Sequence, residues 1–364
     1  MRLSLTLSKY IGRQFFWWFT GIFFSLVALI FTFDLIELMR RGASKQAASL
    51  DIILQMALLK IPLMSQEIIP FAVLFGGMLV FSRLTRNHEL VVARAAGISV
   101  WQFLLPALLI SLFIGAFQVM LFNPFASVMT SRFEHLESQF LRGKSSLLAV
   151  SSSGLWLRQS DQTGQSIIHA QRVLPDSMVL QDVIIYLFED SDRFTSRIDA
   201  NAAELKDGAW NLSDVWLTAP DKPPKFLDSH VIKTDLTLTK IQESFAPPET
   251  MSFWDLLEFI DVMESAGFSA LKHRLYYYSL LARPFLLCAM VLIAATFSLR
   301  LTRYGGTSLV VGGGILAGFL FYFFSDVIYA LGLSASLPVL LAAWSPVGIT
   351  TLLGLAMLMH LEDG

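Results

Sequence analysis

The chain has 364 residues, of which 54% are hydrophobic and 15% are charged, and its mean hydropathy is +0.59. Soluble globular domains have about 45 to 50% apolar and about 25% charged residues, so this composition excludes a soluble globular protein and predicts a membrane protein. The formal net charge of -2 gives no reason to expect a nucleic-acid partner, and the one cysteine, Cys288, excludes an internal disulfide and a thiolate metal cluster.

Six apolar stretches predict membrane spans, because a helix needs roughly 20 apolar residues to cross a hydrocarbon core about 30 Å thick. Three of the stretches carry no charged side chain: residues 14–33, 100–122 and 304–325. Two others contain a charge each, namely Glu67 in residues 61–81 and Arg283 in residues 275–299. The charge-free run at 327–359 is too long for one crossing, and breakers up to Pro338 place the start of the last span near Val339.

Six spans place both termini on the same side of the membrane, and lysines and arginines in short loops indicate which side that is. One side collects Arg2, Lys9, Arg13, Arg83, Arg86, Arg94, Arg300 and Arg303. The other side has Arg40, Arg41, Lys45 and Lys60. Because cytoplasmic loops carry the excess of positive charge, we expect both termini to be cytoplasmic.

The connector at residues 83–99, between the second and third spans, is the most informative segment of the chain. Asn87 or Thr85 can cap a short helix whose first turn carries Glu89, and a carboxylate suits the positive end of a helix. Gly97 can take the left-handed conformation that ends a helix. A membrane subunit that takes force from a soluble motor needs a charged helix of this kind.

The faces of this connector helix differ in character. Leu90, Ala93 and Gly97 fall on one side, whereas Glu89 and Arg94 point elsewhere and are candidates for contacts in a docking cleft. The alternative is a solvated loop that simply follows the positive-inside rule.

From about residue 125 to residue 251 the apolar spans stop and the pattern becomes strand-like. Residues 183–188, 210–217 and 235–240 are rich in β-branched and aromatic side chains, and Asp207-Gly208 is a hairpin signal. We therefore predict an α-helical integral membrane protein of six transmembrane helices (3+3) with an inserted all-β periplasmic domain, a sandwich or jelly-roll-like fold.

The predicted domain organisation follows from these patterns. It comprises residues 1–125 with spans one to three and a cytoplasmic coupling helix near 84–97, residues 126–250 as the periplasmic β domain, and residues 251–364 with an interfacial helix and spans four to six.

The chain shows no catalytic or metal-binding motif. His88-Glu89 lacks the second histidine of a zinc protease motif, and no histidine pairs with another ligand at metal spacing. Gly143-Lys144-Ser145 resembles the end of a P-loop, but Ser138 stands where the first glycine is required. We therefore expect no enzyme activity, metal or cofactor in this chain, and any ATP must be used by a partner.

The fifth span begins with a glycine-rich segment. Gly312, Gly314 and Gly318 place small residues on neighbouring helix faces, which permits close approach between membrane helices. These glycines predict either static helix packing or a movable gate.

Charged residues also gather near the outward ends of the spans. They are Asp34, Glu37, Arg40, Arg41, Glu67, Arg283 and Asp326. An unpaired charge in the apolar layer costs roughly 2.5 to 3.5 kcal/mol, so these positions indicate either function or mutual pairing, for example of Arg283 with Glu67 or Asp326. For Arg40 and Arg41, the alternative is snorkelling to ordinary phospholipid head groups.

Several segments together resemble a known family. They are Tyr10-Ile-Gly-Arg13, the basic pair after the first span, the loop from Glu89 to Ser99, the β insert and the final three spans. In these features essentially the whole chain resembles the YjgP/YjgQ permeases, which are the transmembrane subunits LptF and LptG of the lipopolysaccharide exporter. The short C-terminus after Met359, the opening Tyr10-Ile-Gly and Gly154-Leu-Trp156 resemble LptG more than LptF.

The resemblance implies an ABC exporter of the bacterial inner membrane, in which LptF and LptG pair above a dimer of the ATPase LptB. Lipopolysaccharide would enter between the first span of one permease and the fifth span of the other, and would pass to periplasmic proteins beginning with LptC. Glu89 would make the docking contact with the ATPase, with Arg94 as a weaker contact, and Arg40 and Arg41 would meet lipid A phosphates. Asp34 departs from the family pattern, in which a basic residue is expected.

Two alternatives from other classes stay open. A proton-driven secondary transporter would use Glu67, Arg283 and Asp326 as a relay, although its polar groups should lie near the bilayer midplane. A non-transporting membrane scaffold or sensor would use the β domain to bind a periplasmic partner. Copurification of a P-loop ATPase separates the exporter from both alternatives.

Overall fold

The computed structural model describes residues 5–42, 49–142, 148–151, 154–161, 164–174, 179–189, 193–206, 208–220, 222–234, 246–265, 269–298 and 307–363. Several positions singled out in the sequence lie outside the described residues: Arg2, Lys45, residues 143–145, Asp207, residues 235–240, Gly267, Arg300, Arg303 and residues 304–306. The chain divides into two compact units. The helical unit comprises Met1–Arg142, Glu249–Phe253 and Arg274–Gly364, and the β unit comprises Gly143–Pro248 and Trp254–His273.

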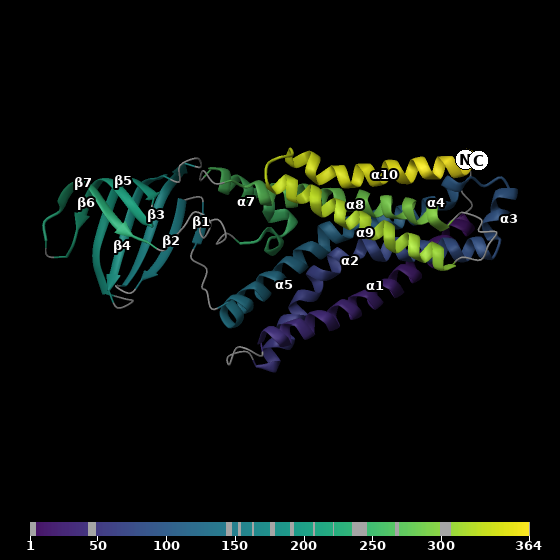
Figure 1. Cartoon of the computed structure of the whole chain (residues 1–364), viewed down its shortest axis with the longest axis horizontal. Coiled ribbons are helices and arrows are strands. Elements are labelled where there is room, and N and C mark those ends of the chain that lie inside the picture. Colours follow the sequence, from purple (N-terminus) through teal and green to yellow (C-terminus); the bar gives the residue numbers. More distant parts are fainter. Residues whose placement is uncertain are drawn as a thin grey trace. The chain divides into compact units, whose positions relative to one another are not determined.

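The predicted six spans are confirmed, because the described chain has six helices that are long and apolar enough to cross a membrane. They are α1 (Leu5–Gly42), α2 (Leu50–Arg86), a third helical segment that begins with α4, then α8 (Leu271–Ser298), α9 (Thr307–Leu333) and α10 (Val339–Asp363). The last helix begins at Val339, as expected. A short helix, α3 (Glu89–Ala95), joins α2 to α4 at one end of the helical unit (Figure 1).

The third helical segment runs without a break through four elements. They are α4 (Val100–Phe117), the π-helical η1 (Gln118–Phe122), α5 (Asn123–Leu136) and the π-helical η2 (Glu137–Arg142). Its candidate span has 42 residues, which corresponds to roughly 60 Å, about twice the thickness of a hydrocarbon core. The end of this segment therefore projects well beyond the apolar layer.

The domain boundary expected at residue 126 falls inside α5, and the first described strand begins only at Leu148. The helix continues past that point because Ala126, Thr130 and Phe133, at helical spacing, are buried. Phe133 packs in an apolar cluster with Leu38 of α1 and with residues of α2. The apolar span thus ends before the helix does.

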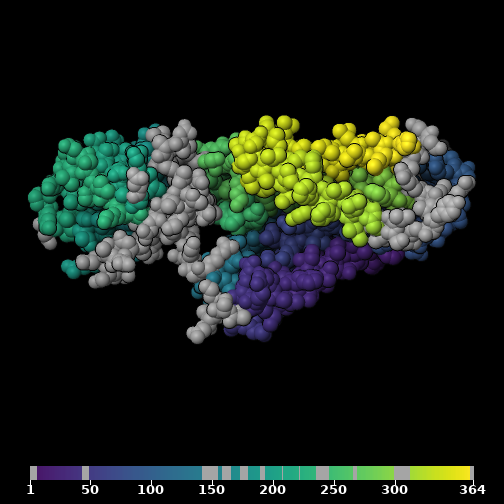
Figure 2. All heavy atoms as spheres, viewed as in Figure 1, coloured from purple at the N-terminus to yellow at the C-terminus, as the bar shows by residue number. Residues whose placement is uncertain are grey.

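Spans two and four form the centre of the helical unit. In the apolar stretches of α2 and α8, 61% of the residues are buried, whereas the values for α1 and α9 are 11% and 17%. A Cβ atom on Gly76 of α2 would lie 2.9 Å from the Cα of Phe19, so α1 packs backbone against backbone on α2 there. In agreement with their low burial, α1 and α9 expose large apolar side chains, and Figure 2 shows both helices at the surface.

The described part of the β unit forms a sheet of seven antiparallel strands. The strands are β1 (Leu148–Ser151), β2 (Gly154–Asp161), β3 (Gly164–Leu174), β4 (Val179–Glu189), β5 (Arg193–Lys206), β6 (Ala209–Thr218) and β7 (Lys225–Lys233). Each strand pairs with its neighbour in the chain, and the sheet curves strongly (Figure 1). One face supplies buried apolar side chains such as Ile185, Ile198 and the fully buried Trp210. The predicted all-β insert is confirmed.

The predicted hairpin in this sheet is also confirmed. Lys206 at the end of β5 pairs with Ala209 at the start of β6, and Gly208 between them has φ +73. A positive φ is the conformation that favours glycine in such a turn. After β7, the 3-10 turn η3 (Pro248–Thr250) leads into α7 (Phe253–Ser265), which lies within the expected interfacial helix segment.

Candidate functional site

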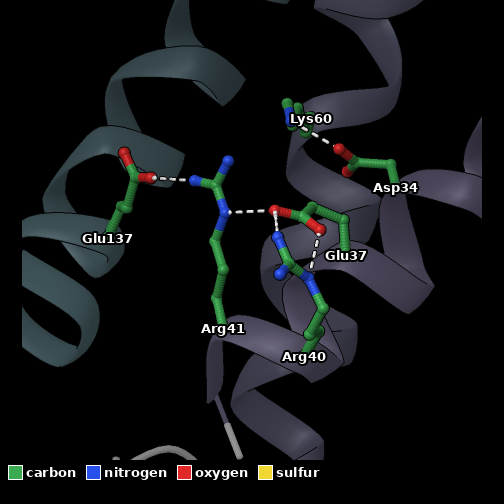
Figure 3. A network of polar contacts seen from close by, with 6 residues as sticks. All are labelled: Asp34, Glu37, Arg40, Arg41, Lys60 and Glu137. Carbon is green, nitrogen blue, oxygen red and sulfur yellow. Dashed lines mark hydrogen bonds and ion pairs between the residues drawn. The ribbon is translucent and has the colours of Figure 1, made fainter. Parts of the chain in front are cut away.

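A cluster of charges lies at the end of α1 that is opposite α3. Glu37 accepts hydrogen bonds from Arg40 Nε at 2.8 Å, Arg40 Nη2 at 2.9 Å and Arg41 Nε at 2.8 Å (Figure 3). The residues lie three and four positions apart, so one helix face brings the carboxylate and both guanidinium groups together. The sequence identified the two arginines as candidates but did not predict that Glu37 would hold both.

The same cluster receives a second carboxylate from the third helical segment. Arg41 Nη1 lies 3.6 Å from an oxygen of Glu137 on η2 (Figure 3). The side chain of Glu137 is 6% exposed, whereas those of Glu37, Arg40 and Arg41 are 36%, 75% and 55% exposed. The arginine cluster (Glu37, Arg40, Arg41 and Glu137) thus combines one buried carboxylate, Glu137, with one partly exposed carboxylate, Glu37, and two largely exposed guanidinium groups.

Asp34, one turn earlier on α1, forms an ion pair with Lys60 of α2. Lys60 Nζ lies 2.5 Å from Asp34 Oδ1 and also 5.5 Å from the centre of the Phe133 ring. Asp34 is 9% exposed, and its Oδ2 has no hydrogen-bond partner among the described residues. A basic side chain, Lys60, therefore lies beside position 34, and the sequence alone did not indicate this ion pair.

The connector forms the expected helix, α3, at the other end of the helical unit. Leu90 and Ala93 are buried, and Leu90 belongs to the main apolar core together with Phe15 and Phe103. Glu89 is half-buried and Arg94 is exposed. Val91 and Val92, which the sequence pattern did not indicate as functional, are 45% and 67% exposed and give α3 an apolar outer surface.

The ends of α3 match the expectation only in part. Gly97 has φ +81, so the predicted left-handed end of the helix is confirmed. The predicted side-chain cap at Asn87 or Thr85 is wrong: His88, with φ 56, is the N-cap and makes no side-chain cap bond. Thr85 instead donates to Phe81 and Ser298 carbonyls, and Asn87 donates from Nδ2 to Glu89 Oε1 at 3.2 Å.

Two of the three candidate glycines on α9 pack against α2. A Cβ atom on Gly314 would collide with the Met78 side chain, and one on Gly318 would lie 3.3 Å from Leu74 Cδ2. Gly312 has no atom of a described residue within 4 Å of its ideal Cβ position. The small-residue face of α9 thus allows a close helix contact at Gly314 and Gly318, and the role of these residues in gating stays a prediction.

The hypothesised pairing of Arg283 with Glu67 or Asp326 is not seen among the described residues. Arg283 Nη1 donates to Gln66 Oε1 at 3.3 Å, whereas Glu67 and Asp326 are exposed. Pairing of these charges was inferred from span positions alone, and α2 turns Gln66 rather than its neighbour Glu67 toward α8. A relay through these three side chains, as the secondary-transporter alternative requires, therefore has no support in the described contacts.

The fold and these sites define a multi-pass membrane protein with an inserted β unit, a connector helix at one end of its spans and clustered arginines at the other. The model of the family "Lipopolysaccharide export system permease LptF/LptG" matches residues 9–360, so the chain belongs to this family. The resemblance inferred from the sequence is confirmed. The chain is thus a membrane permease and a non-catalytic transmembrane component.

Curated relatives agree with this membership. The lipopolysaccharide export system permease protein LptG of Escherichia coli K12 is 26% identical over 367 residues, which covers 97% of this chain and 98% of that protein. The protein of the same name from Haemophilus influenzae is 24% identical over 355 residues and covers 94% of each chain. The match therefore includes the helices and the β insert together.

Proposed function

We propose that this chain is an LptG-like permease of the bacterial inner membrane, with both termini in the cytoplasm and the β unit in the periplasm. It pairs with an LptF-like permease, extracts lipopolysaccharide from the membrane and passes it to periplasmic carriers beginning with an LptC-like protein. The energy comes from ATP hydrolysis in a separate LptB-like dimer. The observation that carries this proposal is the arginine cluster at the end of the least buried span in a chain of this family.

The contact with the ATPase is assigned to α3. Leu90 and Ala93 anchor the helix in the core, and Val91 and Val92 remain exposed beside Glu89. An exposed apolar strip flanked by charge suits a complementary groove, because the strip supplies affinity and the charge fixes register. Motion of the ATPase would reach the spans through the anchored side of the helix.

The lipid path is assigned to α1 and α9, the first and fifth spans. Both expose large apolar side chains, among them Phe24 and Phe33 on α1 and Phe319 and Phe323 on α9. Such surfaces can bury acyl chains at about 25 cal/mol per Å². Arg40 and Arg41 lie beyond the apolar part of α1, where their guanidinium groups can bond lipid A phosphates through pairs of N–H donors.

A photo-crosslinking experiment tests the lipid path. A photoreactive amino acid is placed at Phe33 of α1, at Phe319 of α9 and, as a control, at Leu352 of α10, which are 64%, 64% and 67% exposed. We expect lipopolysaccharide adducts at the first two positions that diminish when ATP is added, and few at the third. Equal adduct yields at all three positions, independent of ATP, would contradict the proposal.

A further inference from the structure

Among the described residues, the arginine cluster pairs two positive charges with two negative charges before any ligand arrives. Its two guanidinium groups face two carboxylates, Glu37 and Glu137. Glu37 occupies both the Nε and the Nη2 donors of Arg40, which is the two-pronged contact that an incoming phosphate would use. An anionic ligand that approaches this edge of Arg40 must therefore compete with Glu37 for the same N–H groups, and a ligand at any other edge still meets the negative charge of Glu37.

The two carboxylates differ in how easily they can be displaced. Glu137 is almost fully buried on η2, and its contact with Arg41 spans 3.6 Å. Glu37 is 36% exposed, and its bonds are contacts within one helix that a small change of side-chain rotamer can break. Exposed ion pairs of this kind contribute little free energy. Glu37 is thus the displaceable anion, and Glu137 stays in place beside Arg41.

Competition with Glu37 favours some phosphate groups over others. A phosphate monoester carries about -1.5 to -2 charges at pH 7 and has three strong acceptor oxygens. A phosphodiester of an ordinary phospholipid carries one negative charge, as Glu37 does, so its exchange for Glu37 brings little electrostatic gain. We propose that Glu37 is a specificity-determining residue that makes Arg40 and Arg41 favour lipids with phosphate monoesters over phosphodiester lipids.

This inference rests on the proposed function, in which Arg40 and Arg41 bind the phosphates of a glycolipid. It adds that the neighbouring carboxylate sets which membrane lipids gain access. Most lipids around α1 are phospholipids, so two bare arginines at the membrane surface would be filled by them. An internal carboxylate provides a competitor that a more highly charged head group displaces more readily than a phosphodiester does.

The test measures lipid retention on the purified full-length chain by native mass spectrometry. The probes are lipid A with two phosphate monoesters, and phosphatidic acid and phosphatidylglycerol with identical acyl chains. Phosphatidic acid carries a phosphate monoester, whereas phosphatidylglycerol carries a phosphodiester. The variants are Glu37→Gln, the arginine double variant Arg40→Gln with Arg41→Gln, and Asp51→Asn, an exposed carboxylate in the first turn of α2 as the charge-matched control.

The wild type and Asp51→Asn should retain lipid A and phosphatidic acid in preference to phosphatidylglycerol. Glu37→Gln should raise retention of phosphatidylglycerol about three- to fivefold, consistent with loss of an exposed ion pair, and bring the ratio of phosphatidic acid to phosphatidylglycerol close to one. A general loss of structure would instead lower retention of all three lipids. An unchanged ratio in Glu37→Gln would overturn the selector role.

The arginine double variant separates this inference from the proposed function. If it retains lipid A as well as the wild type does, phosphate capture by Arg40 and Arg41 is wrong. If it loses lipid A while Glu37→Gln leaves the lipid ratio unchanged, capture stands and only the selector role is wrong. Inorganic phosphate is added as a competitor: persistence of bound lipid A supports a lipid-borne ligand, and complete displacement contradicts it.

Discussion

Gln118 donates a hydrogen bond from Nε2 to the backbone carbonyl of Gln66 at 3.0 Å. This carbonyl lies four residues before Pro70, which has no N–H to offer it. The π-helical turn η1 presents Gln118 to α2 at this point, and both glutamines are buried. The backbone carbonyl that Pro70 leaves without a donor in the second span thus receives a hydrogen bond from a side chain of the third span.

Replacement of Gln118 by Leu should therefore destabilise the protein. The Gln66 carbonyl would remain buried without a partner, which costs about 1 to 3 kcal/mol. Thermal unfolding of the purified chain in detergent measures the effect. Gln55→Leu, at an exposed position of the same helix as Gln66, is the control and should unfold near the wild-type temperature. Equal midpoints for both variants would show that the bond does not matter.

The ion pair between Asp34 and Lys60 predicts strong coupling between two helices. Asp34 is 9% exposed, so Lys60→Met should leave a buried charge uncompensated and cost about 3 kcal/mol. The exchanged pair, Asp34→Lys with Lys60→Asp, should recover part of this loss because it restores attraction at the same place. A thermodynamic cycle of the two single variants and the double variant measures the coupling. Additive losses would contradict the pairing.

Much of the helical architecture could be predicted from the sequence, because span length and loop charge are local properties. The start of α10 at Val339 and the left-handed Gly97 follow from breakers that act within a few residues. The partners of charged residues could not be predicted in the same way. Asp34 and Lys60 are 26 positions apart, and only the packing of α1 on α2 brings them together.

The candidate sites show the same division between local and long-range information. The positions of Arg40, Arg41 and Glu89 near the ends of spans follow from the apolar pattern. The approach of Glu137 does not, because it depends on how far the helix after the third span continues. The helix does continue to Arg142, past the expected boundary. Buried side chains on one face of α5 stabilise this extension, although the extension is less apolar than the membrane span.

The connector helix supplies a prediction about assembly. Glu89→Ala should reduce the amount of ATPase that copurifies with an affinity-tagged full-length chain, because Glu89 would fix the register of α3 in the partner's groove. The loss of one charged contact corresponds to about 1.5 to 3 kcal/mol, or at least about tenfold in affinity. Glu258→Ala on α7, which removes an exposed glutamate, should leave the yield unchanged. If Glu89→Ala copurified as much ATPase as the wild type does, the proposed role of Glu89 in docking would be wrong.

The glycines of α9 allow a matched pair of substitutions. Gly314→Leu places a large side chain where Met78 lies, whereas Gly312→Leu enters open space. Gly314→Leu should separate α9 from α2 and lower the transport rate severalfold, since overpacking typically costs about 1 to 3 kcal/mol. Transport by reconstituted complexes measures the difference. Similar rates for both variants would mean that the close approach of α9 to α2 has no part in transport.

We propose that an external ATPase drives this chain to move a phosphorylated glycolipid held at Arg40 and Arg41. The most direct measurement is ATP-dependent release of lipopolysaccharide to a periplasmic acceptor from proteoliposomes that contain the copurified complex. We expect release that requires ATP and that is largely lost when Arg40 and Arg41 are both replaced by Glu, with the complex still assembled. Release without any copurified ATPase, or undiminished release by the doubly substituted complex, would contradict it.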